Sequence, residues 1–515
     1  MWQNIKLYRV IISTVYFCCL LFLFIDFSHS VPTWIVNVMT WLQVAPSLIN
    51  FISGHQFWST GFVAIIILTL FFGRVYCSFL CPLGTLQDII IHVAGKIKLT
   101  SGFVYLKRQK ILPELILIVS VIPMFAGISV IFGLVEPYSV FGRISYTAFR
   151  PVYLNINNFV TELFSTFSGQ TQNLQQFKVF NQFEIVIVLV TLILIIWLSV
   201  KKGRQYCNLI CPVGISLGWL SRLSIFKLTF GDVECGGCKL CEQNCKAACI
   251  DSKNKKIDFE RCIACFNCLN ICAQNGITYK SSFDKIIQST KNKKDESRRK
   301  LFVTIGIFLF GVAYKALAQT DNNLHVSPDK PLPQKKPVSP PGSVSIKHLL
   351  NVCTLCNLCV NECPTKVLQP AFLEYGFKGF LMPVMNFDVA YCNYQCNACT
   401  QVCPTGALIS LKPTVKKITQ IGLATFNKSD CVVVTNDQPC DICKLRCPTK
   451  AINQVKYKNA ALPEINCEIC NGCGTCEFYC PALPNKAIFV IGNSVHKLIR
   501  LPMKKDLEKN LNVVL

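Results

Sequence analysis

The sequence has few acidic, histidine and methionine residues, and it lacks several cofactor-binding motifs. Its 515 residues include 28 Asp and Glu against 52 Lys and Arg, with only 6 His and 6 Met. No C-x-x-C-H occurs, which excludes attached c-type haem, and no G-x-G-x-x-G follows a strand pattern, which argues against dinucleotide binding. There is no S/T-G-A-T motif for flavin attachment, and no tract of His or Met favours metal delivery.

The composition is that of a membrane protein that also carries soluble domains. Hydrophobic residues make up 51% of the chain and charged residues 16%, with a mean hydropathy of +0.40. A formal net charge of +24 would suggest nucleic acid as the partner of a soluble protein. Basic residues also crowd the cytoplasmic flanks of membrane helices, so we expect the lipid bilayer and no nucleic acid.

Four apolar runs predict an α-helical four-span membrane domain in residues 1–220. The Lys and Arg residues of the connecting loops place the N-terminus and the chain after Lys201 in the cytoplasm. We expect the loops Ser28–Gln56 and Glu136–Gln182 to lie outside. The predicted spans are Leu7–Phe27, Phe57–Phe72, Ile111–Val135 and Phe183–Val200.

An internal repeat follows the second and fourth apolar runs. The pattern GR-x-YC-x3-CP-x-G occurs once with Cys77 and Cys81 and again with Cys207 and Cys211. Cysteines four residues apart face one way on a helix, so the two pairs are candidates for one four-thiolate site. The alternative is a structural turn that buries small thiols.

Two cysteine sets in residues 221–280 have the spacing of bacterial two-cluster ferredoxins, in which the fourth Cys of each set ligates the other cluster. Zinc sites use cysteine pairs at longer separation, so we predict two [4Fe–4S] clusters. Cys249 is surplus to both. One cluster takes Cys235, Cys238, Cys241 and Cys272, and the other takes Cys262, Cys265, Cys268 and Cys245.

The segment Ser297–Ala318 divides the chain. A basic linker, residues 281–300, precedes an apolar run that ends in Ala316-Leu317-Ala318, as in an export signal. Arg298 and Arg299 resemble a twin-arginine signal, whereas the alternative for residues 301–318 is an ordinary fifth membrane helix. Both interpretations place the following residues outside the membrane, and cleavage after Ala318 stays open.

Four more cysteine sets follow a Pro-rich linker, residues 319–345, and precede a tail, residues 496–515. Their C-x2-C loops cannot close as disulfides without strain, so residues 346–495 predict four more [4Fe–4S] clusters, about six in all. Cys467 is one cysteine too many and could replace Cys470 or Cys476. The four sets are Cys353, Cys356, Cys359, Cys363; Cys392, Cys396, Cys399, Cys403; Cys431, Cys440, Cys443, Cys447; and Cys470, Cys473, Cys476, Cys480.

With these motifs, residues 1 to about 280 resemble NapH, the membrane subunit of the quinol dehydrogenase that serves periplasmic nitrate reductase. Residues 297 to about 495 resemble NapG, its exported four-cluster partner. The resemblance implies a NapH–NapG fusion in the bacterial inner membrane, with α+β ferredoxin-like domains on both sides. It also implies electron transfer from membrane quinol to a periplasmic nitrate or nitrous oxide reductase, or to its cytochrome c partner.

The resemblance further implies how the outer sets share ligands. In related four-cluster subunits the first set pairs with the fourth and the second with the third. The implied groups are Cys353, Cys356, Cys359 with Cys480; Cys470, Cys473, Cys476 with Cys363; Cys392, Cys396, Cys399 with Cys447; and Cys431, Cys440, Cys443 with Cys403.

A quinol site needs a polar group at the membrane edge, where ionisable residues are functional candidates. For each such residue, anchoring at the interface is the alternative. A second class of function is an iron–sulfur accessory or maturation factor for a metalloenzyme, because such proteins also carry the CxxxCP motif. The quinol-site candidates are Asp26, His29, His55 and Glu136 on the outer side, and Glu114 nearer the cytoplasmic face.

Overall fold

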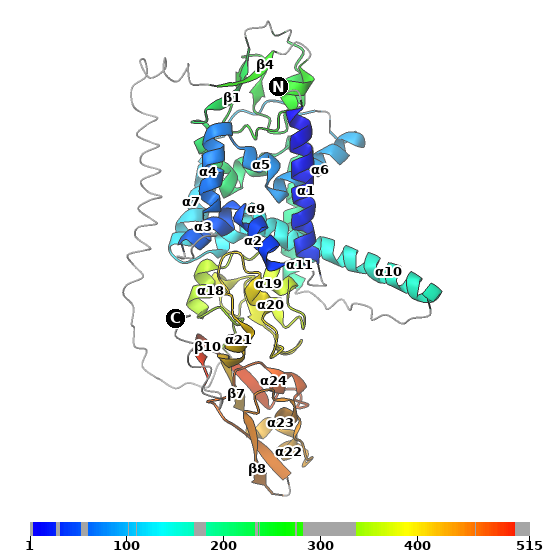
Figure 1. Cartoon of the computed structure of the whole chain (residues 1–515), viewed down its shortest axis with the longest axis vertical. Coiled ribbons are helices and arrows are strands. Elements are labelled where there is room, and N and C mark those ends of the chain that lie inside the picture. Colours follow the sequence, from blue (N-terminus) through cyan, green and yellow to red (C-terminus); the bar gives the residue numbers. More distant parts are fainter. Residues whose placement is uncertain are drawn as a thin grey trace. The chain divides into compact units, whose positions relative to one another are not determined.

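The chain forms two compact units in a computed structural model (Figure 1). The first unit comprises Met1–Ser327, Asn351–Asn361 and Pro404–Gly406, and the second comprises Pro328–Leu350, Glu362–Cys403 and Ala407–Leu515. The structure describes residues 4–26, 31–52, 60–100, 102–109, 111–168, 182–231, 235, 237–272, 276–281, 336–458 and 460–499. The export-like segment Ser297–Ala318 and the candidates His29 and His55 lie outside the described residues.

Among the described residues of the first unit, two helices are long and apolar enough to span a membrane. These are α1 (Ile5–Ile25) and α11 (Gln182–Lys202), each with 21 residues. The pair α2 (Thr33–Trp41) and α3 (Val44–Ile52) is bent by 95° and could form a third span. α4 (Gly61–Phe72), with 12 residues, is apolar but shorter. Two of the four predicted runs are therefore helices of spanning length, and the four-span arrangement stays a prediction.

The prediction of one long helix over Ile111–Val135 is wrong. α7 (Ile111–Phe125) ends at Phe125, and α8 (Val130–Val135) starts after a turn. Gly127 has a φ of +81° in that turn, a backbone conformation that glycine adopts without steric cost. Average hydropathy does not detect such a break, because the residues on both sides of it are apolar.

The two predicted outer loops also contain helices. α2 and α3 lie within Ser28–Gln56. Glu136–Gln182 contains α9 (Pro137–Ile144), a π-helical turn (Ser145–Phe149) and α10 (Arg150–Ser168). Glu136 starts α9, because its carboxylate accepts hydrogen bonds from the backbone N–H groups of Tyr138 and Ser139 at 2.9 and 2.6 Å.

Each CxxxCP repeat folds as a short helix followed by a longer one. The first repeat forms α5 (Val75–Phe79) and α6 (Pro82–Lys96), and the second forms α12 (Gln205–Leu209) and α13 (Pro212–Ser221). In both, the second cysteine is the N-cap residue and the proline occupies the first turn, where its missing N–H costs no hydrogen bond.

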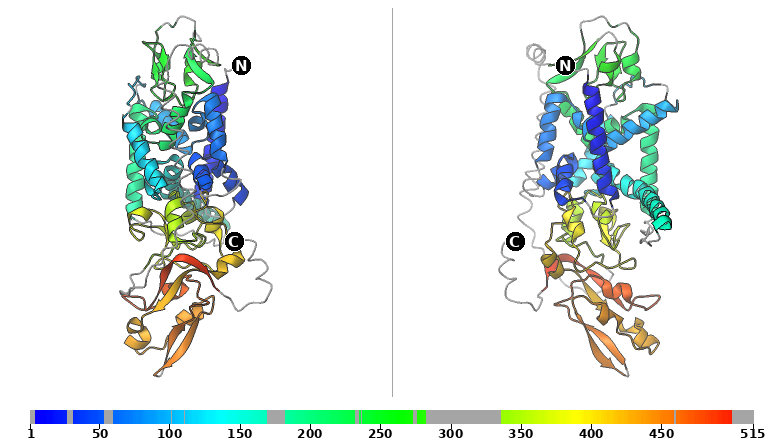
Figure 2. Two further views of the ribbon diagram at one scale, coloured as in Figure 1. Left: turned by 90° about the vertical axis from the view of Figure 1, so that its left-hand side faces the viewer. Right: turned by 45° about the vertical axis from the view of Figure 1, so that its right-hand side comes forward.

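Residues 226–281 form a small α+β module in the first unit. β1 (Phe226–Phe230) pairs with β4 (Ile277–Ser281), and β2 (Ile250–Asp251) pairs with β3 (Lys256–Ile257), both antiparallel. The helices α14 (Leu240–Gln243) and α15 (Asn267–Ile271) carry cysteines of the two sets. Figure 2 shows these strands beyond the N-terminal end of α1.

The second unit is also built from antiparallel pairs and short helices. β5 (Leu368–Pro370) pairs with β6 (Pro383–Met385), β7 (Thr419–Phe426) with β10 (Ile488–Leu498), and β8 (Ile452–Tyr457) with β9 (Ala460–Ile465). The α+β ferredoxin architecture is therefore confirmed. Its helices are α18 (Ile346–Val352), α20 (Ala398–Gln401), α21 (Pro413–Ile418), α22 (Val432–Thr435), α23 (Ile442–Arg446) and α24 (Thr475–Tyr479), with 3-10 turns at Phe377–Gly379 and Lys428–Asp430. The last two residues of α18 and all of α19 (Leu358–Asn361) belong to the first unit.

The order of elements repeats between the two halves of the chain. In the first unit, β1 precedes one cysteine set, the β2–β3 pair separates it from the next set, and β4 follows. In the second unit, β7, the third outer set, the β8–β9 pair, the fourth outer set and β10 follow in the same order. Sets three and four therefore share the element order of the module in the first unit.

Candidate functional site

The structure brings together the cysteines for which a ligand exchange is predicted in the module at residues 226–281. Four predicted ligands of one cluster line a single cavity whose other walls are mostly apolar. Those four are Cys245, Cys262, Cys265 and Cys268. The four cysteines of the other predicted set also lie close together, because Cys241 interacts electrostatically with Cys235, Cys272 and Cys238.

The surplus cysteine of this module, Cys249, lies in the same cavity. Its side chain is only 1% exposed, and its Sγ is 3.5 Å from Sγ of Cys245. The backbone N–H of Cys249 also donates to Sγ of Cys245 at 3.4 Å. Such N–H donors stabilise a ligand thiolate, so Cys249 helps to position Cys245.

The pairing that the resemblance implied for the outer sets is wrong. Cys363, the last cysteine of the first outer set, lines a cavity together with the second set, Cys392, Cys396 and Cys399. Cys447, the last cysteine of the third set, lines a cavity with the fourth set, Cys470, Cys473 and Cys476. Cys480 in turn acts electrostatically on Cys431 and Cys443 of the third set.

The physical reason for this correction is the strand order. Each hairpin brings the sets on its two sides together, so the fourth cysteine of a set reaches its immediate neighbour, as in bacterial ferredoxins. Cys467 does not line the cavity of the fourth set and is exposed. Cys470 and Cys476 line that cavity, and their assignment as ligands stays a prediction.

The donor sets fit iron–sulfur clusters. Burial raises the pKa of the Cys392 and Cys443 thiols to about 11, so without metal they stay protonated and inert. In the part of the chain that the structure describes, no three Cys, His, Asp or Glu side chains are placed to hold a single metal ion. Thiols spread around an apolar cavity suit a multi-iron cluster, and when bound such a cluster accepts and donates single electrons.

The two CxxxCP repeats cross, and each is held by the arginine of the other. Arg204 donates to the Cys77 carbonyl at 2.5 Å, and Arg74 donates to the Cys207 carbonyl at 3.1 Å. Both arginines are almost fully buried, at 0% and 1% exposed. A Cβ at Gly84 or Gly214 would overlap the same carbonyls, which explains the glycine at the end of the motif.

The four repeat cysteines lie together in this buried core. Cys77, Cys81, Cys207 and Cys211 are each 3–4% exposed and interact electrostatically with one another. The Sγ atoms of Cys81 and Cys211 accept the N–H groups of Gly84 and Gly214 at 3.4 and 3.2 Å. The four-thiolate site and the structural turn both remain compatible with this arrangement.

A buried carboxylate joins the repeats to the ferredoxin module. Asp88 on α6 contacts Arg9 of α1 at 2.8 Å, Arg204 of the second repeat at 2.7 Å and Lys246 of the module at 2.9 Å. Burial alone would raise the pKa of Asp88, but Arg204, Lys246 and Arg9 hold it well below its usual range. Sequence reasoning missed Asp88, Arg74 and Arg204, although the arginine recurs in both repeats.

Further hydrogen bonds fix the module on the repeats. Ser78, next to Cys77, donates to the carbonyl of Ala264 at 3.2 Å, and that residue precedes the ligand Cys265. Gln205 and Asn208, which flank Cys207, donate to the carbonyl of Ala247 at 3.3 and 3.4 Å. The buried repeat thiols are thus adjacent in structure to the loops that hold the second cluster of the module.

The segment Asn351–Asn361 packs at the other end of α1. Asn361 donates to the carbonyl of Asp26, which caps the C-terminal end of α1, at 3.2 Å. Ser129 donates to the carbonyl of Cys353 at 2.8 Å, and Arg143 donates to that of Leu355 at 3.3 Å. Cluster ligands therefore lie at both ends of a helix of spanning length.

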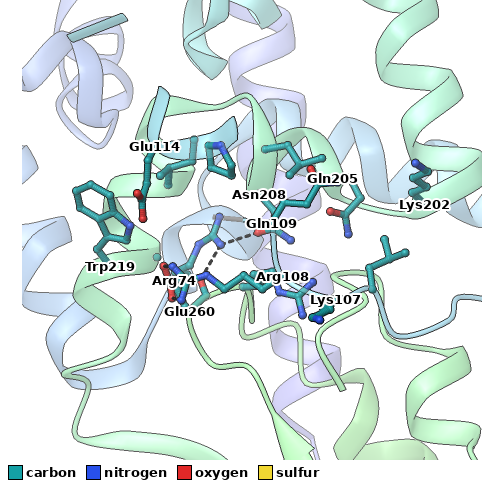
Figure 3. Close-up of a pocket in the computed structure, with 16 residues that line it drawn as sticks. Arg74, Lys107, Arg108, Gln109, Glu114, Lys202, Gln205, Asn208, Trp219 and Glu260 are labelled. Carbon is teal, nitrogen blue, oxygen red and sulfur yellow. Dashed lines mark hydrogen bonds and ion pairs between the residues drawn. The ribbon is translucent and has the colours of Figure 1, made fainter. Parts of the chain in front are cut away.

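The quinol-site candidates that the structure describes lie in different environments. Asp26 is 3% exposed at the contact with Asn361, and Glu136 is fully buried as the cap of α9. Glu114, on α7, lines a cavity of about 110 Å³ together with Trp219, Gln205 and Arg108 (Figure 3). Glu114 therefore faces space that a ligand could occupy, whereas Asp26 and Glu136 are buried.

Comparison with known protein families supports the iron–sulfur assignment. A model described as a 4Fe-4S binding domain matches residues 55–100 and 185–231, which include both CxxxCP repeats. Models described as 4Fe-4S dicluster domains match residues 343–407 and 258–367. No solved structure gives a significant match.

Curated relatives identify the kind of protein. The ferredoxin-type protein NapF of Escherichia coli K12 is 32% identical over 145 residues, 28% of this chain and 80% of NapF. The chain belongs to the ferredoxin-type iron–sulfur protein family. The methylamine utilization ferredoxin-type protein MauM of Methylorubrum extorquens is 30% identical over 28% of this chain and 69% of MauM. The ferredoxin-type protein NapG of E. coli K12 is 28% identical over 31% of this chain and 71% of NapG.

For this ferredoxin-type protein, the expectation of a NapG-like part with [4Fe–4S] clusters is confirmed. Its relatives are consistent with electron transfer or with an iron–sulfur accessory role. The NapH-like membrane part, the fusion of the two parts and the number of clusters stay predictions.

Proposed function

We propose that this ferredoxin-type protein oxidises membrane quinol and passes the electrons through its clusters to a periplasmic terminal reductase, of the nitrate or nitrous oxide type. The observation that carries the proposal is the placement of cluster ligands within the first unit. The module at residues 226–281 meets α1 near Arg9, and the segment with Cys353, Cys356 and Cys359 meets it at Asp26. A 21-residue helix is about 30 Å long, the thickness of the hydrocarbon core.

The buried repeat thiols support the same route. Cys77 and Cys207 lie inside the first unit, next to the loops of the ferredoxin module. The family model that matches both repeats carries the description of a 4Fe-4S binding domain. A cluster held by the four repeat cysteines would shorten the electron path between the two ends of α1.

Quinol-dependent reduction of the clusters in membranes tests the proposal. The full chain is expressed in membranes and kept anaerobic. The visible absorbance of its clusters should bleach when a quinol is added and recover when an electron acceptor is added. No bleaching with either a benzoquinol or a naphthoquinol, while dithionite still reduces the clusters, would contradict the proposal and favour an accessory role.

The iron content of the purified protein is the first quantitative prediction. Six sets of four cysteines imply about 24 iron atoms and about 24 sulfides per chain. A seventh cluster at the CxxxCP repeats would raise both values by about four. A value near eight would mean that residues 346–495 carry no clusters.

A second prediction concerns sidedness and the arginine pair before the export-like segment. Replacing Arg298 and Arg299 by Lys keeps the charge but removes the planar guanidinium groups that a receptor reads. We expect residues beyond Ala318 to stay inside, with the membrane domain still inserted. Protease added to spheroplasts should digest the outer domain of the wild-type protein and spare that of the variant. Equal digestion would identify a plain membrane helix.

A further inference from the structure

The residues that line the cavity at the start of α7 indicate which kind of ligand it binds. It lies between α7, α12, α13 and the loop of the ferredoxin module that contains Glu260 and Arg261. We infer that this cavity binds the ring of the quinol, with Glu114 as the proton acceptor and Trp219 packed against the ring. The inference rests on the proposed function and adds the location and residues of the quinol site.

The volume of the cavity is near that of cavities that bind one aromatic ring. It is about 110 Å³, and a closed apolar cavity of about 150 Å³ binds benzene. The cavity is partly open, so the remainder of a two-ring quinol would project from it. Figure 3 shows Glu114 and Trp219 both projecting toward this space, and an indole face stacks favourably on another ring.

Part of the charge around the cavity is paired. Arg108 forms a two-point ion pair with Glu260, with distances of 2.6 and 2.5 Å, and Arg222 contacts the same carboxylate. Arg261 is paired with Asp258 at 2.9 Å, while Arg74, Lys107 and Lys202 also line the cavity, so its lining is basic. A phosphate or lipid headgroup in the cavity would also face the carboxylate of Glu114.

A buried donor in the lining points to an oxygen ligand. Nε of Arg74 is buried and has no hydrogen-bond partner among the described residues. The rest of that guanidinium is held by Asn208 at 2.7 Å and by the carbonyl of Glu260 at 3.1 Å. Leaving a buried N–H unsatisfied costs about 1–3 kcal/mol, which a quinone oxygen in the cavity would recover.

The cavity adjoins apolar surface along which a membrane-dissolved molecule could arrive. Three side chains at the start of α7 are exposed and apolar: Ile111 is 82%, Leu112 45% and Leu115 54% exposed. Glu114 lies among them in the sequence, and Trp197 on α11 is 52% exposed. The isoprenoid tail of a quinol would cover such surface while its ring enters the polar cavity.

The ferredoxin module supplies the electron acceptor next to this cavity. Glu260 and Arg261 line it and immediately precede Cys262, a predicted ligand of the second cluster. Gln205 and Asn208 line it as well and donate to the carbonyl of Ala247, two residues after Cys245. Only one loop therefore separates the ring from the ligands of that cluster.

The electrons and protons of the reaction balance. Quinol gives up two electrons and two protons to become quinone. For each electron that leaves the ring, an O–H bond breaks and its proton goes to the carboxylate of Glu114. Glu114 then releases that proton to water before the second transfer. Clusters held by the two cysteine sets of the module would supply the one-electron acceptors, one for each electron.

The test uses the full chain in nanodiscs, with menadiol as a soluble naphthoquinol. Replacing Glu114 by Gln keeps the shape but removes the proton acceptor, and Trp219→Leu removes the ring contact. Each should slow menadiol-dependent cluster bleaching at least tenfold, since a positioned general base contributes about 10²-fold or more. Glu162→Gln, a carboxylate on α10 outside the cavity lining, is the matched control.

Two further measurements distinguish an error in the proposed site from an error in the proposed function. Dithionite reduction and iron content should equal those of the wild-type protein in all three variants, which shows intact clusters. An azidonaphthoquinone photolabel should modify the wild-type chain near Trp219 or Glu114, and menadione should displace it. Bleaching of the wild-type protein with unchanged rates in both variants, or labelling elsewhere, would overturn the site but leave the proposed function standing. No bleaching of the wild-type protein would overturn the proposed function itself.

Discussion

Replacing Asp88 by Asn should destabilise the first unit by about 3–5 kcal/mol, the usual cost of removing one partner from a buried ion pair. Asp88 is the carboxylate that Arg9, Arg204 and Lys246 share. The variant leaves three cations without that partner, two of them (Arg9 and Arg204) buried, at the point where α1, the second repeat and the ferredoxin module meet. Thermal unfolding in detergent and protease release of the module both measure the loss.

A control variant and a double variant show whether the loss of stability comes from the Asp88 network. Asp251→Asn is the control, because that carboxylate bonds only its neighbour Asn254 at an exposed turn, so stability should be unchanged. Adding Lys246→Met to the Asp88 variant removes one stranded cation and should recover part of the stability. A stable Asp88→Asn protein would mean that the network does not hold the module in place.

The pH dependence of the stability that this network contributes follows from the direction in which the pKa of Asp88 is shifted. The folded-state pKa of Asp88 lies below its ordinary value of 3.8, so the unfolded chain binds the proton more readily. Its contribution to stability is therefore complete above the ordinary value and is lost as pH falls through the lowered pKa. Changing the pH between 8 and 6 should leave this contribution unchanged.

Double substitutions of cysteines should reveal which outer cysteines share a cluster. Cys447→Ala and Cys473→Ala should each lose about four iron atoms and, combined, still lose only about four, because both ligate one cluster. Cys447→Ala combined with Cys396→Ala should lose about eight. Iron analysis and the electron paramagnetic resonance of the reduced protein measure both outcomes.

The same design tests the first outer pair of sets. Cys363→Ala combined with Cys396→Ala should lose one cluster, about four iron atoms, because both line one cavity. The pairing implied by the NapG resemblance gives the opposite pattern, with Cys447 and Cys396 sharing a cluster. Loss of about four iron atoms in the Cys447→Ala, Cys396→Ala protein would therefore restore that pairing.

The local cluster motifs could be predicted from sequence because their geometry is set over a few bonds. Three cysteines in C-x2-C-x2-C span one short loop, so the chain itself holds their thiols close together. The exchange of Cys245 and Cys272 in the first module was also predictable, since that spacing is specific to two-cluster ferredoxins. Hydropathy located α1 and α11 because each is one uninterrupted apolar helix.

Partners that are distant along the chain were decided only by the tertiary structure. Whether Cys447 joins the second or the fourth outer set depends on the β8–β9 hairpin, which brings the third and fourth sets together. The crossed contacts of Arg74 and Arg204 likewise join segments more than a hundred residues apart, and the three cations at Asp88 also come from distant segments.

The candidate site shows the same division. The sequence alone identifies Glu114, Asp26 and Glu136 as ionisable groups at a membrane edge, but it does not show which of them belongs to a quinol site. The fold uses Glu136 to cap α9 and places Asp26 against Asn361, whereas Glu114 lines a cavity with Trp219 and the loop before Cys262. Burial and hydrogen-bond partners separate these carboxylates, and both depend on how the helices pack.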